Sequence, residues 1–517
     1  MASEGTNRAI VKNTLILYVR SFIMMAIGIF TTRIILQAVG VENFGLYGVV
    51  GSVISMFTIL NGVLSAGSSR FLTFELGRKD AEKLKKTFSA SFAMHFAMAI
   101  VLLVAFETVG LWFVNHKINI PEGRGFAANV VYQLSVFSCL LSITQVPYGA
   151  VIIAREKFDI FAYVGIGEAI FKCVLPLSLL YLDFSDNLIA YAIICTVWSV
   201  GLQMFYRIYC YRRFPETHLS ICREKSIYRS MLGYSLWDLL GQFCASGNTQ
   251  GLNILINLFF GVRLNASRSL AYTVDGKITQ FNGQFLTSVT PQITKSYAQR
   301  SYRRFFELIY ESGRCSFFLL FLLSLPVFLE ADYLISVWLV EVPPMTVLFL
   351  RLIIIHTLIR SPSRPIITGV HATGDVRFLN LTSGLLVCIL YLPSIYVFYK
   401  IGMPVWFCFV TLFSLDLVCD YIEALALKRR VMFSLADYFK SVYLKSILAL
   451  TPAVMLSILP ICFLPQNFAR CAITCLLCAF STLVSVYCFG ITAETRRKVK
   501  VFLHEKGFFL EPLCFWR

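Results

Sequence analysis

Long apolar runs dominate the pattern of hydrophobic and polar positions along this chain. A helix needs about 20 mainly apolar residues to cross the hydrocarbon core of a bilayer. Runs of this length recur from one end of the chain to the other, and the connections between them are short. We predict about fourteen spanning helices, which start near Asn13, Leu46, Phe88, Ala127, Asp159, Leu188, Arg229, Ala266, Ser312, Met345, Arg377, Pro404, Phe439 and Phe468.

Lysine and arginine concentrate in alternate connections. If the N-terminus is cytoplasmic, the inward-facing segments hold 30 Lys or Arg residues and the outward-facing loops hold four. Cytoplasmic loops of membrane proteins carry such an excess. We therefore predict a multi-pass membrane protein with both termini cytoplasmic. The first run lacks a small-residue cleavage site, so it is predicted to span the membrane and not to be a signal peptide.

Composition supports the membrane assignment. Hydrophobic residues make up 57% of the 517 positions and charged residues 15%, whereas soluble domains carry about 25% charged residues. The formal charge of +17 does not indicate a nucleic-acid partner, because no soluble basic domain is present to bind one. Most of the sixteen cysteines lie within apolar runs, where cysteine packs as a small hydrophobe. Disulfides, metal sites and cofactors are not predicted.

An internal repeat at an offset of 221 residues relates the two halves. Gly40-Val41 aligns with Gly261-Val262, and Asn61-Gly62 aligns with Asn282-Gly283. A second echo pairs Pro147 and Ala154 with Pro365 and Ala372. Parallel repeats hold substrate between the halves near the midplane. The predicted domains are two pseudo-symmetric six-helix bundles, two extra helices and a basic cytoplasmic tail, at residues 1–212, 213–430, 431–492 and 493–517.

Four motifs carry a resemblance to a known family. They are Thr31-Thr32-Arg33-Ile34 through Gly40-Val41-Glu42-Asn43-Phe44-Gly45-Leu46-Tyr47, Arg70-Phe71-Leu72-Thr73-Phe74-Glu75-Leu76-Gly77, Pro147-Tyr148 followed by Ile153-Ala154-Arg155-Glu156-Lys157, and Pro291-Gln292-Ile293-Thr294-Lys295-Ser296-Tyr297. The chain resembles the multidrug/oligosaccharidyl-lipid/polysaccharide (MOP) exporter superfamily, and within it the O-antigen-type flippases and polysaccharide biosynthesis proteins. The resemblance implies two six-helix bundles in a V shape, located in a bacterial inner (cytoplasmic) membrane. It also implies alternating access and a polyprenyl-pyrophosphate-linked oligosaccharide as substrate.

Polar residues inside the predicted spans are the candidate site residues. An intramembrane charge costs at least about 2.5–3.5 kcal/mol on insertion scales, so each one needs a reason. Arg20 and Arg33 of the first span are about 20 Å apart along a helix, which suits a phosphate that moves between two depths. Snorkelling to the bilayer surface is the alternative for Arg33.

The seventh and eighth spans are unusually polar. Such faces line a water-filled cavity, or they hold helices together. The seventh span carries a stripe at helical spacing of Asp238, Gln242, Ser246, Thr249, Asn253 and Asn257. The eighth carries Arg268, Asp275, Lys277, Thr279, Gln280, Asn282 and Gln284.

The remaining intramembrane charges have two interpretations each. Glu168 and Lys172, at i and i+4, form a structural pair or take part in ion coupling. Arg351 and Arg360 are end anchors or line the cavity. The lone His356 is a packing residue or part of a proton relay. Carboxylates of the twelfth span lie on one face near Lys428, which would partly neutralise them: Asp416, Asp420 and Glu423.

These residues give the predicted site. No catalytic or metal-ligating residue is predicted, and ion coupling is assigned to Glu168, Asp238 and Asp275. The substrate-binding candidates are Arg20, Arg33, Asn61, Lys172, Asp238, Gln242, Asn253, Arg268, Lys277, Asn282, Arg351 and Arg360.

The sequence thus predicts a flippase that moves lipid-linked oligosaccharide repeat units to the periplasmic leaflet for O-antigen or capsule export. The alternative is an ion-coupled multidrug exporter of the same superfamily. An enzyme is not expected, because no large outward loop is present to hold a catalytic site. The expected partners are the lipid-linked substrate, membrane lipids, and a polysaccharide polymerase with its chain-length machinery.

Overall fold

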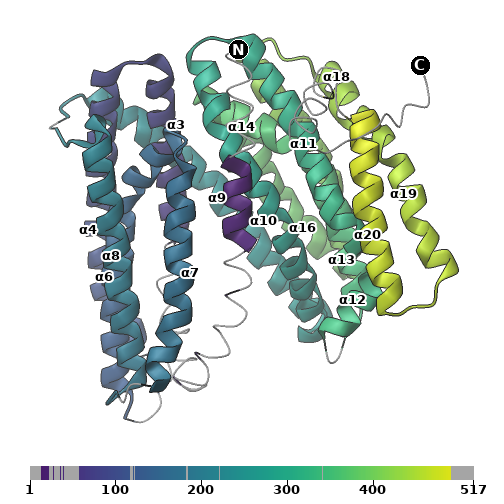
Figure 1. The fold of residues 1–517 in the computed structure, drawn as a ribbon, viewed down its shortest axis with the longest axis horizontal. Coiled ribbons are helices and arrows are strands. Elements are labelled where there is room, and N and C mark those ends of the chain that lie inside the picture. Colours follow the sequence, from purple (N-terminus) through teal and green to yellow (C-terminus); the bar gives the residue numbers. More distant parts are fainter. Residues whose placement is uncertain are drawn as a thin grey trace, which may run out of the picture. The chain divides into compact units, whose positions relative to one another are not determined.

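The computed structural model describes residues 13–22, 27, 35, 39, 58–116, 120, 123–181, 184–220, 222–339, 342–490 and 496. Every regular element among these residues is helical, so the chain is an all-α protein (Figure 1). The helices of the first part are α3 (Thr58–Arg78), α4 (Ala81–Ala105), α5 (Leu111–His116), α6 (Gly125–Ala154), α7 (Phe158–Tyr181) and α8 (Asn187–Arg213).

Twelve further helices follow within the described residues. They include two of the longest, of 36 and 37 residues. The helices are α9 (Lys225–Phe260), α10 (Val262–Ala298), α11 (Tyr302–Leu329), α12 (Ala331–Trp338), α13 (Thr346–Arg360), α14 (Ser363–Thr373), α15 (Arg377–Leu379), α16 (Leu385–Lys400), α17 (Phe407–Lys428), α18 (Leu435–Tyr438), α19 (Lys445–Phe463) and α20 (Phe468–Ser485).

Eight of the described helical segments are long and apolar enough to cross a membrane. The number is nine if α13 and α14, which meet at a bend of 48°, form one broken span. The long helices α3, α9, α10 and α17 are not among them, because polar residues interrupt their apolar runs. The protein is therefore a multi-pass membrane protein, and the number fourteen stays a prediction.

The chain divides into two compact units. The first comprises residues 1–247, 287–305 and 368–388, and the second comprises 248–286, 306–367 and 389–517. Each unit thus combines segments that are distant in the sequence, so a unit is not a continuous stretch of chain. The predicted domain boundaries after residues 212, 430 and 492 stay predictions.

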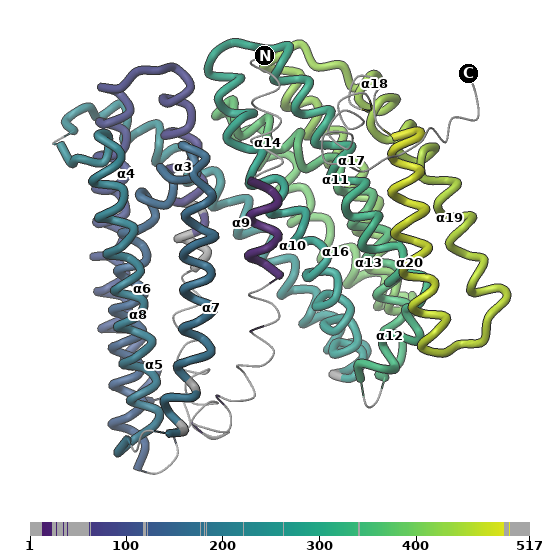
Figure 2. The backbone as a smooth tube through the Cα atoms, viewed as in Figure 1, coloured from purple at the N-terminus to yellow at the C-terminus, as the bar shows by residue number. Residues whose placement is uncertain are grey.

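Helices α4, α6 and α8 lie side by side in the first unit (Figure 2). Large apolar side chains fill the space between them, including the fully buried Phe106 and Tyr132. The hydroxyl of Tyr132 donates to the carbonyl of Phe106 at 2.8 Å, where α4 ends in a π-helical turn over Phe106–Gly110. This bond satisfies the one polar atom of a buried ring.

In the second unit, α19 and α20 pack against each other. Phe317, Phe318 and Phe321 of α11 form a core cluster with Leu450 of α19 and Cys478 of α20. The two C-terminal helices are therefore joined to the rest of this unit by an apolar seam.

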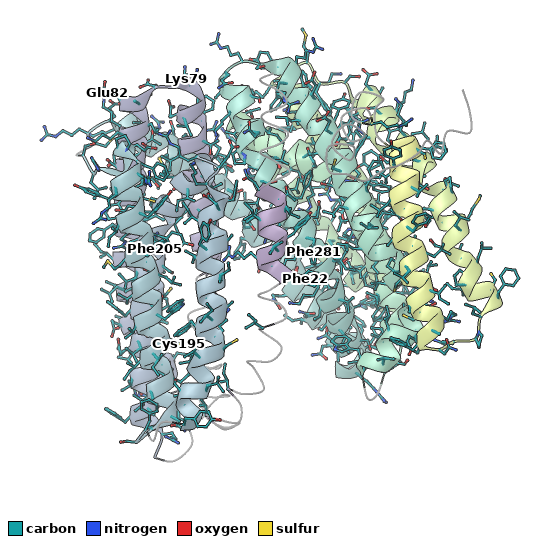
Figure 3. The ribbon with its side chains drawn as sticks, viewed as in Figure 1. Phe22, Lys79, Glu82, Cys195, Phe205 and Phe281 are labelled. Carbon is teal, nitrogen blue, oxygen red and sulfur yellow. The ribbon has the colours of Figure 1, made fainter. Side chains whose placement is uncertain are left out.

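The outward faces of the spans are apolar, as lipid contact requires. Phe205 of α8 is 48% exposed and Leu476 of α20 is 72% exposed. Figure 3 shows Phe205 and Cys195 on α8, and Lys79 and Glu82 at the turn that joins α3 to α4. The charged turn lies at the helix ends and the exposed rings lie between the ends, which is the pattern of a membrane span.

Turn geometry repeats along the chain at the offset that the sequence repeat predicts. Lys79, after α3, has φ 60°, and Arg300, 221 positions later and after α10, has φ 56°. Left-handed residues are uncommon outside glycine, so their recurrence is informative. Backbone bonds recur as well, since Lys79 N–H bonds to the Leu76 carbonyl and Arg300 N–H to the Tyr297 carbonyl.

Candidate functional site

Arg268 of α10 is a buried cation in the described part of the second unit. It is 3% exposed, and its guanidinium lies 4.7 Å from the ring centroid of Tyr272. One nitrogen donates to Asn253 Oδ1 at 2.6 Å and to the Thr249 carbonyl at 3.3 Å. Among the described residues, its Nε has no hydrogen-bond partner and no carboxylate pairs with it. The structure thus brings together two predicted site residues, Arg268 and Asn253.

Two other predicted residues of α10 are buried polar groups. Asp275 is 8% exposed, and its Oδ1 has no hydrogen-bond partner within the described chain. The side chain of Thr357 bonds to this carboxylate. Asn282 is buried with its Oδ1 also without a partner there. Lys277, two positions after Asp275, is exposed, so the helix presents buried and accessible polar groups on different sides.

Asp238 of α9 is a buried carboxylate in the first unit. It is 4% exposed, and its Oδ2 has no hydrogen-bond partner among the described residues. No cation of the described chain lies within ion-pair distance of it. Gln242, one turn further along, is exposed, so the predicted polar stripe changes from buried to accessible along the helix.

Arg20, Glu168 and Lys172 form a three-membered charge cluster in the first unit. Glu168 lies 3.0 Å from Lys172 and 3.9 Å from Arg20. The predicted i, i+4 pair is therefore present, but a second cation joins it. Because two cations share one carboxylate, the cluster carries a net positive charge. All three side chains are partly exposed.

Arg360 of α13 lies in a buried acidic network and is not a free end anchor. It pairs with Glu423 at 2.8 Å and with Asp420, both on α17. Asp416 of the same helix lies 3.7 Å away and also accepts a hydrogen bond from His356 Nε2. The expectation that Lys428 neutralises these carboxylates is corrected, since Arg360 is the cation that they contact and Lys428 is exposed.

Three remaining candidates need separate mention. Arg351 bonds to Asp332 at 2.7 Å and to the Phe328 carbonyl at 3.2 Å, which fits the anchor interpretation. Arg33 lies outside the described residues. Asn61 lies in α3, but its side chain is outside the described part.

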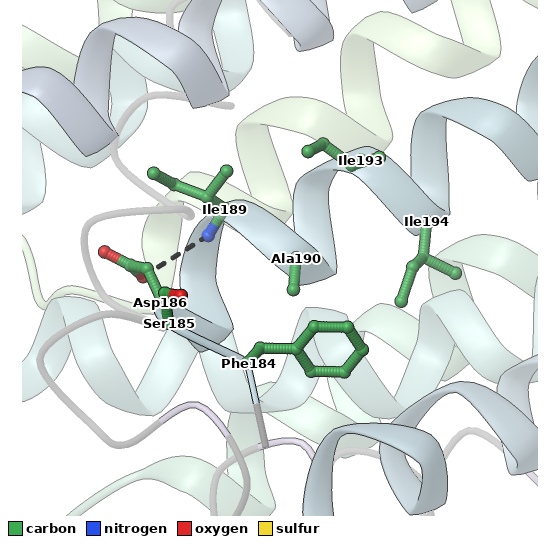
Figure 4. Close-up of a pocket in the computed structure, with 7 residues that line it drawn as sticks. All are labelled: Phe184, Ser185, Asp186, Ile189, Ala190, Ile193 and Ile194. Carbon is green, nitrogen blue, oxygen red and sulfur yellow. Dashed lines mark hydrogen bonds between the residues drawn. The ribbon is translucent and has the colours of Figure 1, made fainter. Parts of the chain in front are cut away.

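A shallow hollow of about 310 Å³ lies at the start of α8 (Figure 4). Asp186 caps this helix, with its Oδ1 accepting from the backbone N–H of Leu188 and of Ile189. The other lining residues are Phe184, Ser185, Ile189, Ala190, Ile193 and Ile194. An apolar wall with one capping carboxylate does not suit an anionic substrate, so this hollow is not part of the candidate site.

No protein-family model matches this chain, and no curated protein matches it. Solved structures do match it in fold. A MATE variant superposes with a TM-score of 0.69 at 12% identity, over 82% of this chain and 96% of the other. An outward-facing multidrug resistance MATE family transporter of the MOP superfamily gives 0.68 at 13% identity, over 82% and 97%.

The chain has the fold of a MOP-superfamily transporter. A third match is a MOP superfamily transporter from Pyrococcus furiosus, with a TM-score of 0.66 and 13% identity, over 82% of this chain and 96% of the other. At this identity the likeness concerns the fold alone, so the substrate has to be argued from the side chains.

The candidate charged groups that lie outside the Arg360 network of this MOP fold are of two kinds. Arg268 and the Arg20–Lys172 cluster are cationic and suited to phosphate oxygens. Asp238 and Asp275 are buried carboxylates with an unbonded oxygen, which suits a proton or a small cation. Sequence reasoning missed the pairing of His356 with Asp416, although both residues stood out as polar positions in apolar runs.

Proposed function

We propose that the protein is a flippase that moves polyprenyl-pyrophosphate-linked oligosaccharide repeat units from the cytoplasmic to the periplasmic leaflet by alternating access. Such a substrate carries a pyrophosphate and a hydrated glycan across about 30 Å of hydrocarbon. The transporter must therefore supply cations for the phosphates and hydroxyl or amide groups for the sugars.

The observation that carries this proposal is the buried guanidinium of Arg268. A buried charge without a counter-ion is destabilising, so its retention inside a membrane helix favours a role with an anionic ligand. Asn253 holds it in place with a bond of 2.6 Å. The charge cluster of Arg20, Lys172 and Glu168, with two cations and one carboxylate, adds a second cationic position.

The second candidate function is an ion-coupled multidrug exporter. Its support is the buried carboxylates Asp238 and Asp275, since cationic drugs favour acidic sites, and the MATE neighbours in fold. The Pyrococcus furiosus neighbour is described as having a binding pocket of reverse polarity that suggests a different function. Polarity therefore differs among proteins of this fold, and the uncompensated arginine favours the anionic substrate here.

The test is Arg268→Ala in a strain that depends on this protein for its surface polysaccharide. We expect surface polysaccharide to fall by about 100-fold, because the lost charge-assisted bonds to phosphate contribute about 1.5–3 kcal/mol each. Lipid-linked repeat units should accumulate in the inner leaflet, as measured by extraction and chromatography. Arg263→Ala is the matched control, since Arg263 is an exposed arginine of the same helix.

Two outcomes would overturn this proposal. One is normal surface polysaccharide in the Arg268→Ala strain at normal protein levels. The other is protein-dependent efflux of cationic dyes from a drug-sensitive host, which would favour the multidrug exporter.

For coupling, we propose that Asp275 takes up and releases a proton during the cycle, with Glu168 and Asp238 as further candidates. Asp275→Asn cannot change its charge, so we expect repeat-unit flipping in proteoliposomes to become independent of an imposed pH gradient. Wild-type protein should flip several-fold faster with the gradient than without it. An undiminished response to the gradient in Asp275→Asn would assign coupling elsewhere.

The cellular setting follows from the same proposal. The protein would lie in the bacterial inner membrane with both termini cytoplasmic, in contact with membrane lipids. A polysaccharide polymerase and its chain-length machinery would receive the flipped repeat units on the periplasmic side.

A further inference from the structure

Arg70, at the last turns of α3, contacts the turn that ends α14. Its Nε donates to the carbonyl of His371 and its NH2 nitrogen to the carbonyl of Ala372, both at 3.2 Å. These carbonyls belong to the last turn of a helix, where the regular i→i+4 bonds end; the His371 carbonyl also accepts from the Gly374 backbone N–H at 3.0 Å. The Tyr234 hydroxyl and His371 Nδ1 are 2.6 Å apart. The arginine therefore caps a helix that belongs to the other half of the sequence.

Glu156 makes a second contact between the two halves. It lies in the turn between α6 and α7, and its carboxylate accepts a hydrogen bond from Lys295 of α10 and another from Gln292. The side chains of Lys295 and Glu156 are 20% and 12% exposed. This ion pair is therefore shielded from solvent more than an ordinary surface pair, which contributes little.

The two contacts are related by the internal repeat. Glu156 has φ 58° and Gly374 has φ 82°, and both follow helices that align when Ala154 is set on Ala372. Arg70 and Lys295 lie one helical turn apart when α3 is set on α10 at the 221-residue offset. Each half thus supplies a cationic side chain near the end of one helix and a turn with a left-handed residue. The cation of each half contacts the turn of the other half.

Helices α3 and α10 also meet directly at equivalent positions. A Cβ atom at Gly77 would lie 2.9 Å from the Cβ of Ala298 and 3.0 Å from the Cα of Lys295. Ala298 is the repeat partner of Gly77 at the 221-residue offset. Backbones approach this closely only where a residue has no side chain.

We propose that these contacts form a clasp that locks the two sequence halves together on the predicted cytoplasmic side. The clasp consists of Arg70 with the turn His371–Gly374, and Glu156 with Gln292 and Lys295. This inference rests on the proposed transport function, because alternating access requires the halves to separate on the side from which substrate enters. The clasp stabilises the state that is closed there, and its opening admits the lipid-linked headgroup.

Hydrogen–deuterium exchange of the purified protein in lipid nanodiscs tests the clasp without any substrate. We expect Lys295→Glu, Glu156→Lys and Arg70→Gln each to speed exchange about ten-fold in segments 153–158, 291–299 and 368–377, because fewer contacts hold the closed state. The double exchange Glu156→Lys with Lys295→Glu restores the pair, so its exchange should return toward the wild-type rate. Segments in α19 and α20 should not change.

Arg124→Glu is the control, because it breaks the pair of Arg124 with Asp186 inside the first half and should leave the three clasp segments unchanged. Wild-type exchange in the single variants would overturn the clasp. Faster exchange in α19 and α20 as well would show a general structural role and would also overturn it. Exchange that remains fast in the double variant Glu156→Lys with Lys295→Glu would also overturn the clasp. If the Arg268→Ala strain makes normal surface polysaccharide while the clasp variants exchange as expected, the proposed substrate is wrong and the clasp proposal is retained.

Discussion

Replacing Arg360 with alanine is expected to lower the free energy of unfolding by about 3–5 kcal/mol, because it leaves buried carboxylates without their cation. The Arg360 side chain is 16% exposed, and Glu423 is 3% exposed. Asp416 and Asp420, at 14% and 17% exposed, depend on the same guanidinium. Thermal unfolding of the purified protein in detergent, followed by intrinsic fluorescence, measures the change.

Two companion variants separate charge from packing. Arg360→Lys keeps the charge but loses the fork of donors that reaches two carboxylates at once, so its loss should be smaller. Adding Glu423→Gln to Arg360→Ala removes one stranded charge and should recover part of the stability. If Arg360→Ala unfolds at the wild-type temperature, the network contributes nothing and our assignment of Arg360 is wrong.

The sequence predicted which positions of this network are polar but not how they pair. On α17, the spacing of Asp416, Asp420 and Glu423 places them on one face, which periodicity reveals. The partner helix α13 carries Arg360 and His356 at compatible spacing. Their pairing depends on which helix packs against which face, and a single sequence does not contain that information. The nearer cation in sequence, Lys428, was therefore the wrong choice.

For the same reason, the sequence reveals the motifs of the clasp but not the contacts between them. The motifs at Arg70, Glu156 and Lys295 were recognised as typical of a family, yet the sequence did not reveal that they meet. Pseudo-symmetry appeared in the sequence only as weak identities, whereas left-handed turns at Lys79 and Arg300 repeat it in the backbone. Conformation repeats more faithfully than side chains because few backbone geometries can end a helix.

Hydropathy predicted the all-α membrane fold but did not determine the number of spans. The helices α9 and α10 are long but polar, so their length and composition do not identify them as membrane-spanning. They carry Asn253 and Arg268, which we propose as substrate contacts. A helix that lines a hydrated passage through a membrane has fewer apolar residues than a helix that faces lipid, so hydropathy detects it less well.

Replacing Arg470 with alanine is expected to be as destabilising as the loss of Arg360, at about 3–5 kcal/mol. Arg470 of α20 bonds to both carboxylate oxygens of Glu330, at 3.1 Å and 2.8 Å. The Glu330 side chain is fully buried, and the Thr474 hydroxyl donates to it at 2.9 Å.

This ion pair joins the end of α11 to the C-terminal helix pair, beside the apolar cluster of Phe317, Leu450 and Cys478. A double-mutant cycle with Glu330→Gln and Arg470→Ala measures the coupling by thermal unfolding in detergent. The double variant should be more stable than Arg470→Ala alone, because a neutral amide is less costly to bury than an unpaired carboxylate. Strictly additive losses would mean that the two residues act independently, and the pair would then not hold α20 in place.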